Sequence, residues 1–305
     1  STITETGVYW GTAANPGTTG IKKPIGSGTG LFTATLTGLS SNTKYYVQAY
    51  AVNEAGENKG EEVSFTTANE TGNGIIFNPD LTYGTMTDID GNIYKTIQIG
   101  AQVWMAENLK VTHYADGTAI PLVEDSAAWY ALGYSDKAYC WYGNSTENRD
   151  IYGGLYTWAA AMNETASSNA NPSGVQGVCP DGWHLPSDDE WKQLEMHMGM
   201  SQIEVDQTGS RGTDEGCKLK ETGTGHWRSP NNGATNSTGF SALPGGDRSN
   251  LGAFGFMSDF AFFWTATQND IYYAWNRVLW ESTCQLSRIS NGDKKNGFSV
   301  RCVED

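Results

Sequence analysis

The chain has 305 residues and a formal net charge of -15; charged residues make up only 17%, while there are 37 glycines, 11 tryptophans and 15 tyrosines. This composition excludes a disordered or mainly helical protein and leaves room for two β-rich domains. The negative charge makes nucleic acid and anionic lipid surfaces poor partners, and no apolar run approaches the ~18 residues of a membrane-spanning helix.

Residues 1–68 alternate between apolar and polar positions and are punctuated by glycine, asparagine and proline, which predicts a β-sandwich. The segment 36–56 resembles a strand corner of a fibronectin type III domain, with Leu36, Leu39 and Tyr45 at that family's leucine and corner-tyrosine positions. Because such a sandwich needs two further strands, we expect a partial domain that exposes an apolar face. The expected strands cover residues 6–12, 30–39, 43–52 and 61–67.

A polar, glycine-rich stretch over residues 69–80 is the predicted linker, and the second domain is predicted over residues 81–305. The second domain opens with residues 88–109, whose apolar positions and turn residues predict a β-hairpin. We expect this hairpin to turn at Asp90–Asn92.

Two stretches of the second domain have the apolar spacing of amphipathic helices. The first covers residues 152–164. In the second, Ser187 and Glu190 have the spacing of a capping box, so a helix is predicted to begin at Asp188 and to stop at Gly199. Short strands separated by long turns follow, an order that is typical of the α+β class. On the second helix we expect one face to carry Trp191, Leu194 and Met198, and Lys192, Gln193 and Glu195 to point elsewhere.

The cysteines and histidines do not form a recognisable catalytic or metal motif. The five cysteines, at positions 140, 179, 217, 284 and 302, lack a C-x-x-C pair, which argues against zinc-ribbon and thioredoxin-type sites. Two disulfides with one free thiol, in an oxidising compartment, are favoured over five buried thiols. His184, just before the second helix, is interpreted as a packed or backbone-bonded residue and not as a metal ligand.

Six motifs, taken in order, resemble the Fibrobacter succinogenes major paralogous domain of Bacteroidetes and Fibrobacteres surface proteins, over residues 85–305. They are DGNIYKTIQIGAQVWMAENL, YGGLYTWAAAMN, CPDGWHLPSDDEW, GFSALPGGDR, FWTATQ and GFSVRCV. That family is similar to C-type lectin-like domains, so the resemblance implies two short helices with small, twisted antiparallel sheets. It also implies a disulfide between Cys179 and Cys302. We assign Cys217 to Cys284 less firmly and leave Cys140 open.

The segment HLPSDDEW is also similar to formylglycine-generating enzymes. Those enzymes use a reactive cysteine pair, and their sulfoxide-type relatives use a three-histidine iron site; neither set can be aligned with this sequence. We therefore expect a binding protein without catalytic activity, and an oxidoreductase of that type is the less favoured alternative.

In lectin-like domains, ligands usually meet the long loops and late strands, and a sugar site needs exposed aromatic rings beside polar side chains. The alternative for each tryptophan is burial in the core. Calcium is a candidate ligand by the same resemblance, although no acidic cluster dictates a site. The expected role is adhesion or glycan capture by a secreted or cell-surface protein, and a structural or protein-binding module such as a fimbrial tip component is the rival. The predicted ligand-binding residues are Asp247, Arg248, Tyr273, Trp275, Arg277, Trp280 and Asn291.

Overall fold

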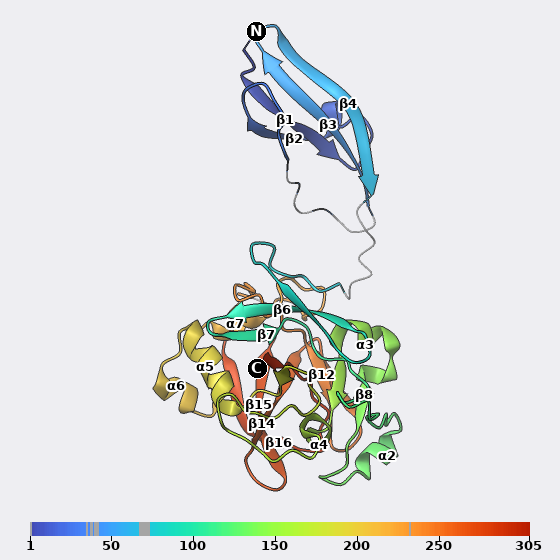
Figure 1. Cartoon of the computed structure of the whole chain (residues 1–305), viewed down its shortest axis with the longest axis vertical. Helices are drawn as coiled ribbons and strands as arrows, with labels where there is room; N and C mark the ends of the chain where they lie inside the picture. Colours follow the sequence, from blue (N-terminus) through green and yellow to red (C-terminus); the bar gives the residue numbers. More distant parts are fainter. Residues whose placement is uncertain (1, 35, 37–38, 40–42, 67–73, 232) are drawn as a thin grey trace. The chain divides into compact units, whose positions relative to one another are not determined.

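The chain divides into two compact units, residues 1–72 and 73–305. The predicted linker overlaps the second unit, because Ile75 is buried against Tyr152 and Leu243 and so enters its core. The second unit thus begins earlier than the predicted residue 81. The computed structural model (Figure 1) describes residues 2–34, 36, 39, 43–66, 74–231 and 233–305.

The first unit contains an antiparallel sheet with the strand order β2–β1–β3–β4. The strand predicted over residues 30–39 is wrong, since the described part of this segment is irregular. The sequence pattern misses β2 because Pro24 suggests a turn, yet proline is tolerated on an edge strand. The fibronectin type III resemblance stays a prediction. The elements are β1 (Glu5–Gly11), α1 (Pro16–Thr19), β2 (Ile21–Gly26), β3 (Lys44–Asn53) and β4 (Gly56–Thr66).

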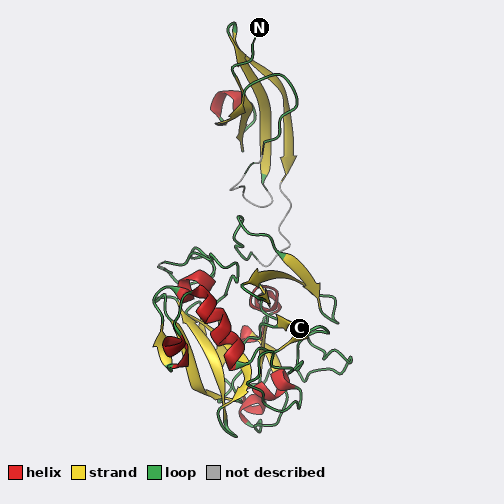
Figure 2. Cartoon of the chain, turned by 60° about the vertical axis from the view of Figure 1, so that its left-hand side comes forward, coloured by secondary structure: helices red, strands yellow, loops and turns green. Residues whose placement is uncertain are grey.

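The second unit combines sheets with short helices, in agreement with the predicted α+β class (Figure 2). One of its sheets has the strand order β10–β17–β7–β6–β5. The predicted hairpin over residues 88–109 is part of a meander, because the turn at Asp90–Asn92 joins β5 to β6 and a second turn at Gly100, with a φ of 63°, joins β6 to β7. The strands are β5 (Gly84–Thr87), β6 (Ile93–Ile99), β7 (Gln102–Met105), β10 (Trp183–His184) and β17 (Val303–Glu304).

A larger sheet contains the late strands in the order β11–β16–β15–β14–β12–β13. Its centre is an antiparallel hairpin of β14 and β15, in which Phe260 pairs with Trp280. All seven residues predicted to bind a ligand lie on strands of this sheet. Its strands are β11 (Gly209–Arg211), β12 (Gly245–Arg248), β13 (Phe254–Met257), β14 (Phe260–Gln268), β15 (Tyr273–Trp280) and β16 (Leu286–Asp293), and a separate ladder joins β8 (Tyr139–Trp141) to β9 (Gly154–Tyr156).

The two predicted helices differ in how well local signals describe them. The helix predicted over residues 152–164 forms only as α4 (Trp158–Met162), because residues 154–156 belong to β9 and Thr157 then caps the helix. The second prediction is confirmed: α5 spans Asp188–Met198 and begins with the capping box of Ser187 and Glu190. The other helices are α2 (Ser126–Tyr130), η1 (Tyr142–Asn144), α3 (Thr146–Tyr152), α6 (Gln202–Asp206) and α7 (Glu215–Leu219).

Helix α5 lies against the larger sheet (Figure 2), and Trp191 and Leu194 share a buried cluster with Phe263 of β14. Glu195, predicted to point away from this apolar face, is also fully buried. Its carboxylate accepts hydrogen bonds from Arg211 of β11 and from Arg277 of β15. The helix is thus joined to the sheet by buried ion pairs as well as by apolar packing.

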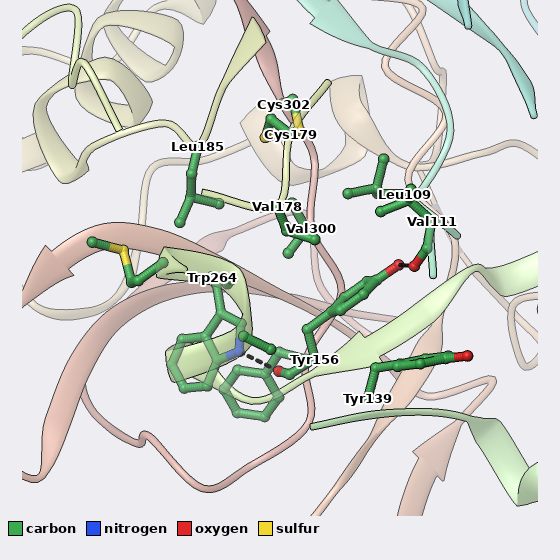
Figure 3. Packing of buried hydrophobic residues seen from close by; sticks show 14 of the residues in the cluster. Leu109, Val111, Tyr139, Tyr156, Val178, Cys179, Leu185, Trp264, Val300 and Cys302 are labelled. Carbon is green, nitrogen blue, oxygen red and sulfur yellow. Dashed lines mark hydrogen bonds between the residues drawn. A yellow bond between two sulfur atoms is a disulfide. The ribbon is translucent and has the colours of Figure 1, made fainter. Parts of the chain in front are cut away.

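A second buried cluster surrounds the disulfide between Cys179 and Cys302 (Figure 3). Within it, the Trp264 indole donates a hydrogen bond to the Tyr156 carbonyl, and the Tyr156 hydroxyl donates to the Val111 carbonyl. A further disulfide joins Cys217 to Cys284, so both expected pairs are formed. Among the described residues, Cys140 is a buried free thiol.

Candidate binding surface

The residues predicted to bind a ligand do not lie on one surface, and the two arginines must be removed from the set. The Arg248 guanidinium is buried and donates hydrogen bonds to the carbonyls of Val123 and Glu124. Arg277 is equally buried in ion pairs with Asp188 and Glu195. Both arginines stabilise the fold, because a guanidinium whose donors are used inside the protein cannot reach a ligand in solution.

Asp247 is also in the interior, with 7% of its surface exposed. Its Oδ1 atom has no hydrogen-bond partner among the described residues. Burial raises the pKa of this carboxyl to about 7. Asp247 is therefore a destabilised buried acid and not a surface ligand contact, which corrects its predicted role.

The remaining predicted residues are accessible but separated along β15 and β16. Tyr273 and Trp280 stand at the two ends of β15, about 23 Å apart at ~3.3 Å per residue. Trp275, between them, is half-buried, and the Arg288 guanidinium lies 3.7 Å from the centre of its ring. Asn291 is exposed on β16. A ligand contacting Tyr273 thus cannot be assumed to reach Trp280.

At the Tyr273 end, exposed aromatic and aliphatic side chains from two distant segments come together. We call Tyr130, Tyr134, Ile271, Tyr272 and Tyr273 the tyrosine surface; between 36% and 70% of each residue is exposed. The rings of Tyr134 and Tyr272 are 5.0 Å apart, and those of Tyr272 and Tyr273 are 6.5 Å apart. Such a group of exposed tyrosines is typical of recognition surfaces, since each ring has an apolar face and a polar tip.

The turn between β14 and β15 holds its part of this surface through hydrogen bonds. One carboxylate oxygen of Asp270 accepts from the amides of Tyr272 and Tyr273, at 2.8 and 2.9 Å. The buried amine of Lys294 donates to the Asp270 carbonyl and to the Gln268 side chain. Burial lowers the pKa of Lys294. These bonds fix both the two tyrosines and an exposed carboxylate beside them.

The other part of the surface comes from α2 and the residues after it. Trp129 is buried under α2, and its indole donates a hydrogen bond to the Lys295 carbonyl. The Lys295 amine in turn donates to the Tyr130 carbonyl and lies 5.9 Å from the ring of Tyr134. Burial raises the pKa of Tyr134, and the nearby charge of Asp293 raises it further. Sequence reasoning missed Tyr130 and Tyr134, because no local pattern links them to a turn more than a hundred residues later.

Other titratable groups serve the fold. His184 lies between Glu190 and Asp305, 2.6 and 2.7 Å from their carboxylates, so it is packed, as predicted, but bonded to acids. Burial lowers the pKa of His184, but the hydrogen bond with Glu190 and the contact with Asp305 outweigh burial and raise it overall. Burial raises the pKa of the Cys140 thiol to about 12, and therefore keeps it protonated.

The concave parts of the second unit offer a weaker alternative to the tyrosine surface. A pocket of about 240 Å³ is lined by residues that include Asp88, His113 and Asp181. The Asp88 carboxylate already accepts hydrogen bonds from Asn92 and Tyr94, and His113 is paired with Asp90 at 2.6 Å. In the part of the chain that the structure describes, no three His, Cys, Asp or Glu side chains converge as a metal site requires.

Comparison with known proteins identifies one family. Residues 97–304 match the Fibrobacter succinogenes major domain, which is more than half of the chain. No curated protein and no solved structure matches the chain. Within the described residues, no helix has the length and apolar character needed to cross a membrane.

Proposed function

This chain belongs to the Fibrobacter succinogenes major domain family, and on that premise we propose that it is a non-catalytic binding protein that captures a glycan through the tyrosine surface. The observation that carries the proposal is the fixed position of exposed rings beside the Asp270 carboxylate. A sugar presents apolar C–H faces together with hydroxyl groups. Rings can stack on those faces, and a carboxylate can accept hydrogen bonds from the hydroxyls.

The rigidity of this surface supports binding, because ordering loops and side chains opposes association. Tyr272 and Tyr273 are held by Asp270, and Tyr130 is held from below by Lys295. A ligand would therefore meet side chains whose backbone is already in place. Only one of the predicted contact residues, Tyr273, belongs to this surface.

The disulfides support a location outside the reducing cytosol, because such bonds persist in oxidising compartments. Both lie in the second unit, where Cys179 and Cys302 are buried and connect segments 123 residues apart. We therefore place the protein at the cell surface or in the extracellular medium. The protonated, buried Cys140 supports a role without thiol chemistry, since an attacking cysteine needs an accessible thiolate.

A glycan array probed with wild-type protein, Tyr272→Ala and Ile203→Ala tests the proposal. Ile203 on α6 is exposed and lies outside the tyrosine surface, so its variant is the matched control for loss of an apolar surface side chain. We expect specific glycan signals that fall by about tenfold in Tyr272→Ala, as expected for losing ~1.4 kcal/mol of ring contact. Equal signals for all three proteins would contradict the assignment of this surface.

A protein partner is the second candidate, favoured by Ile271, whose aliphatic side chain is 70% exposed at the centre of the turn. Aliphatic side chains flanked by tyrosines are common where proteins dock, as in an adhesive fimbrial tip. A blank array together with Tyr272-dependent binding of a purified surface protein would favour this function over glycan capture.

A further inference from the structure

A buried histidine joins the start of helix α5 to Asp305, which comes directly after strand β17. His184 lies on β10, and only 3% of its side chain is exposed. Its Nε2 atom lies 2.6 Å from Oε1 of Glu190, and its Nδ1 atom lies 2.7 Å from Oδ1 of Asp305. Each ring nitrogen is thus at hydrogen-bond distance from a carboxylate oxygen. We call these three residues the histidine clasp.

The clasp requires the charged form of the histidine ring. A carboxylate accepts hydrogen bonds but does not donate them, so both ring nitrogens must carry a hydrogen in order to bond two carboxylates. A neutral imidazole carries one N–H group, whereas the imidazolium ion carries two. Burial lowers the pKa of His184, but the two acids outweigh burial and raise this pKa above its ordinary value. The positions of the acids therefore define an imidazolium held between two carboxylates.

The two acids differ in how firmly the protein holds them. The Glu190 carboxylate is buried, and its Oε2 atom accepts hydrogen bonds from the amides of Ser173 and Ser187, at 3.0 and 2.9 Å. The Asp305 side chain is 62% exposed, so water can replace the ring as its partner. When the ring loses one proton, its remaining N–H group therefore stays with Glu190. The bare nitrogen then faces Asp305 with a lone pair, which repels the carboxylate.

We propose that the histidine clasp is a pH-sensitive latch that fastens Asp305 against β10. At low pH the doubly protonated ring bonds both acids, and the latch is closed. As pH rises, the ring gives one proton to the solvent, keeps its bond to Glu190 and releases Asp305. The latch shares no residue with the tyrosine surface, so it stands or falls independently of the proposed function.

The released segment is short, because the disulfide fixes Cys302, three residues before Asp305. Within this segment the Asp305 amide donates to the Gly182 carbonyl, next to the ladder of β10 and β17. Asp305 and His184 also line a pocket of about 430 Å³, where Asp181 adds a third acid on the same side. Opening the latch should therefore loosen the end of this ladder and uncover the histidine ring toward the pocket.

NMR spectroscopy of the full chain tests the latch without any ligand. The Cε1–H signal of the His184 ring is followed from pH 5 to pH 9. Hydrogen exchange of the residue-305 amide is measured at both ends of this range and corrected for the intrinsic rate. In the variant Asp305→Asn the side-chain amide can accept from an N–H group or donate to a lone pair, so its contact survives both forms of the ring. Asp181→Asn is the matched control, since it removes an exposed acid from the same pocket.

We expect the His184 titration midpoint to lie above ~6.5, to fall by ~0.5 pH units in Asp305→Asn and to stay unchanged in Asp181→Asn. Protection of the residue-305 amide should fall by about threefold as the ring of the wild type loses its proton, and should not depend on pH in Asp305→Asn.

A midpoint below ~6.5, or one that Asp305→Asn leaves unchanged, would overturn the latch. The same conclusion follows if amide protection in the wild type is equal at both pH values. If protection falls equally in the wild type and in Asp305→Asn, the segment loosens for a reason other than His184, and the inference fails.

Discussion

The buried Asp247 carboxyl makes the stability of the second unit depend on pH in a predictable direction. Burial raises its pKa from 3.8 to about 7, so the folded protein binds a proton more tightly than the unfolded chain does. Stability from this group is fully present below pH 4 and is lost as pH rises through 7. At about 1.4 kcal/mol per pH unit, full ionisation in place costs about 4 kcal/mol as an upper limit, since any water that reaches the carboxylate reduces the cost.

Asp247→Asn removes the ionisation and keeps the shape of the side chain. We expect the free energy of unfolding of the variant, minus that of the wild type, to increase by ~2–4 kcal/mol between pH 4 and pH 8. The new amide adds a polar group without partners, but this penalty is the same at every pH, so it shifts the curve without changing its slope.

Urea unfolding at pH 4, 5, 6, 7 and 8, followed by tryptophan fluorescence, measures this difference. Ten of the eleven tryptophans lie in the second unit, so the signal reports on the unit that contains Asp247. Other titrating groups contribute equally to both proteins and cancel in the comparison. A difference that stays constant over this range would refute the reasoning and indicate that Asp247 is hydrated or paired.

Three further predictions concern the ion pairs, the disulfide and the free thiol. Glu195→Gln should destabilise the second unit by ~3–5 kcal/mol in urea unfolding, because it removes the charge between two buried arginines. Asp189→Asn, at a half-exposed position, should change stability by less than ~0.5 kcal/mol. Equal effects of the two would contradict a buried network. Replacing Cys179 and Cys302 together by alanine should cost ~4–5 kcal/mol, because the bond closes a long loop, and an unchanged midpoint would show that the unfolded chain is compact without it. Cys140 should resist iodoacetamide at pH 7 until urea unfolds the chain, as mass spectrometry can follow; rapid labelling of the native protein would contradict its burial and its raised pKa.

Local signals predicted helix α5 well because its start depends on residues three positions apart. Ser187 and Glu190 form the capping box, and Trp191 enters the core as its spacing implied. The burial of Glu195 could not be predicted from the helix alone, since its partners Arg211 and Arg277 lie on strands far along the chain. A helical wheel separates apolar from polar positions, but it does not reveal which polar positions find buried partners.

The binding surface was harder to predict because strand alternation does not say what covers each face. The candidate ligand contacts included Tyr273, Trp275 and Arg277, which alternate along β15. In the structure the pairing of β15 with β16 shifts between Ala274 and Asn276, and α5 covers the Arg277 end of this face. The end of this face at the turn between β14 and β15 stays exposed. There Tyr272 and Tyr273, which follow Asp270, lie beside Tyr134, which follows α2. Of the tyrosine surface, only Tyr273 was identified as a candidate from the sequence, and the grouping of the other residues with it required the tertiary fold.

A buried lysine holds the chain at each end of β15. Lys294 donates to the Asp270 carbonyl under the tyrosine surface, and Lys220 donates to the carbonyls of Trp280 and Thr283 at the far end of the strand. Replacing either amine by methionine keeps much of the side-chain volume but leaves buried carbonyls without donors. The turn above that lysine should then lose its fixed position, and at the Lys294 end the cost of ordering it should weaken binding.

The matched pair Lys294→Met and Lys220→Met therefore tests the tyrosine surface without changing a ligand contact. We expect Lys294→Met to reduce Tyr272-dependent array signals by about tenfold, which corresponds to a loss of ~1.4 kcal/mol, and Lys220→Met at the far end of β15 to leave these signals unchanged. Hydrogen exchange of the Tyr272 and Glu281 amides provides a readout that does not depend on any ligand. The Tyr272 amide should exchange faster only in Lys294→Met, and the Glu281 amide only in Lys220→Met. If both variants weakened the array signals equally, β15 would respond as one unit, and the independence of its two ends would have to be abandoned.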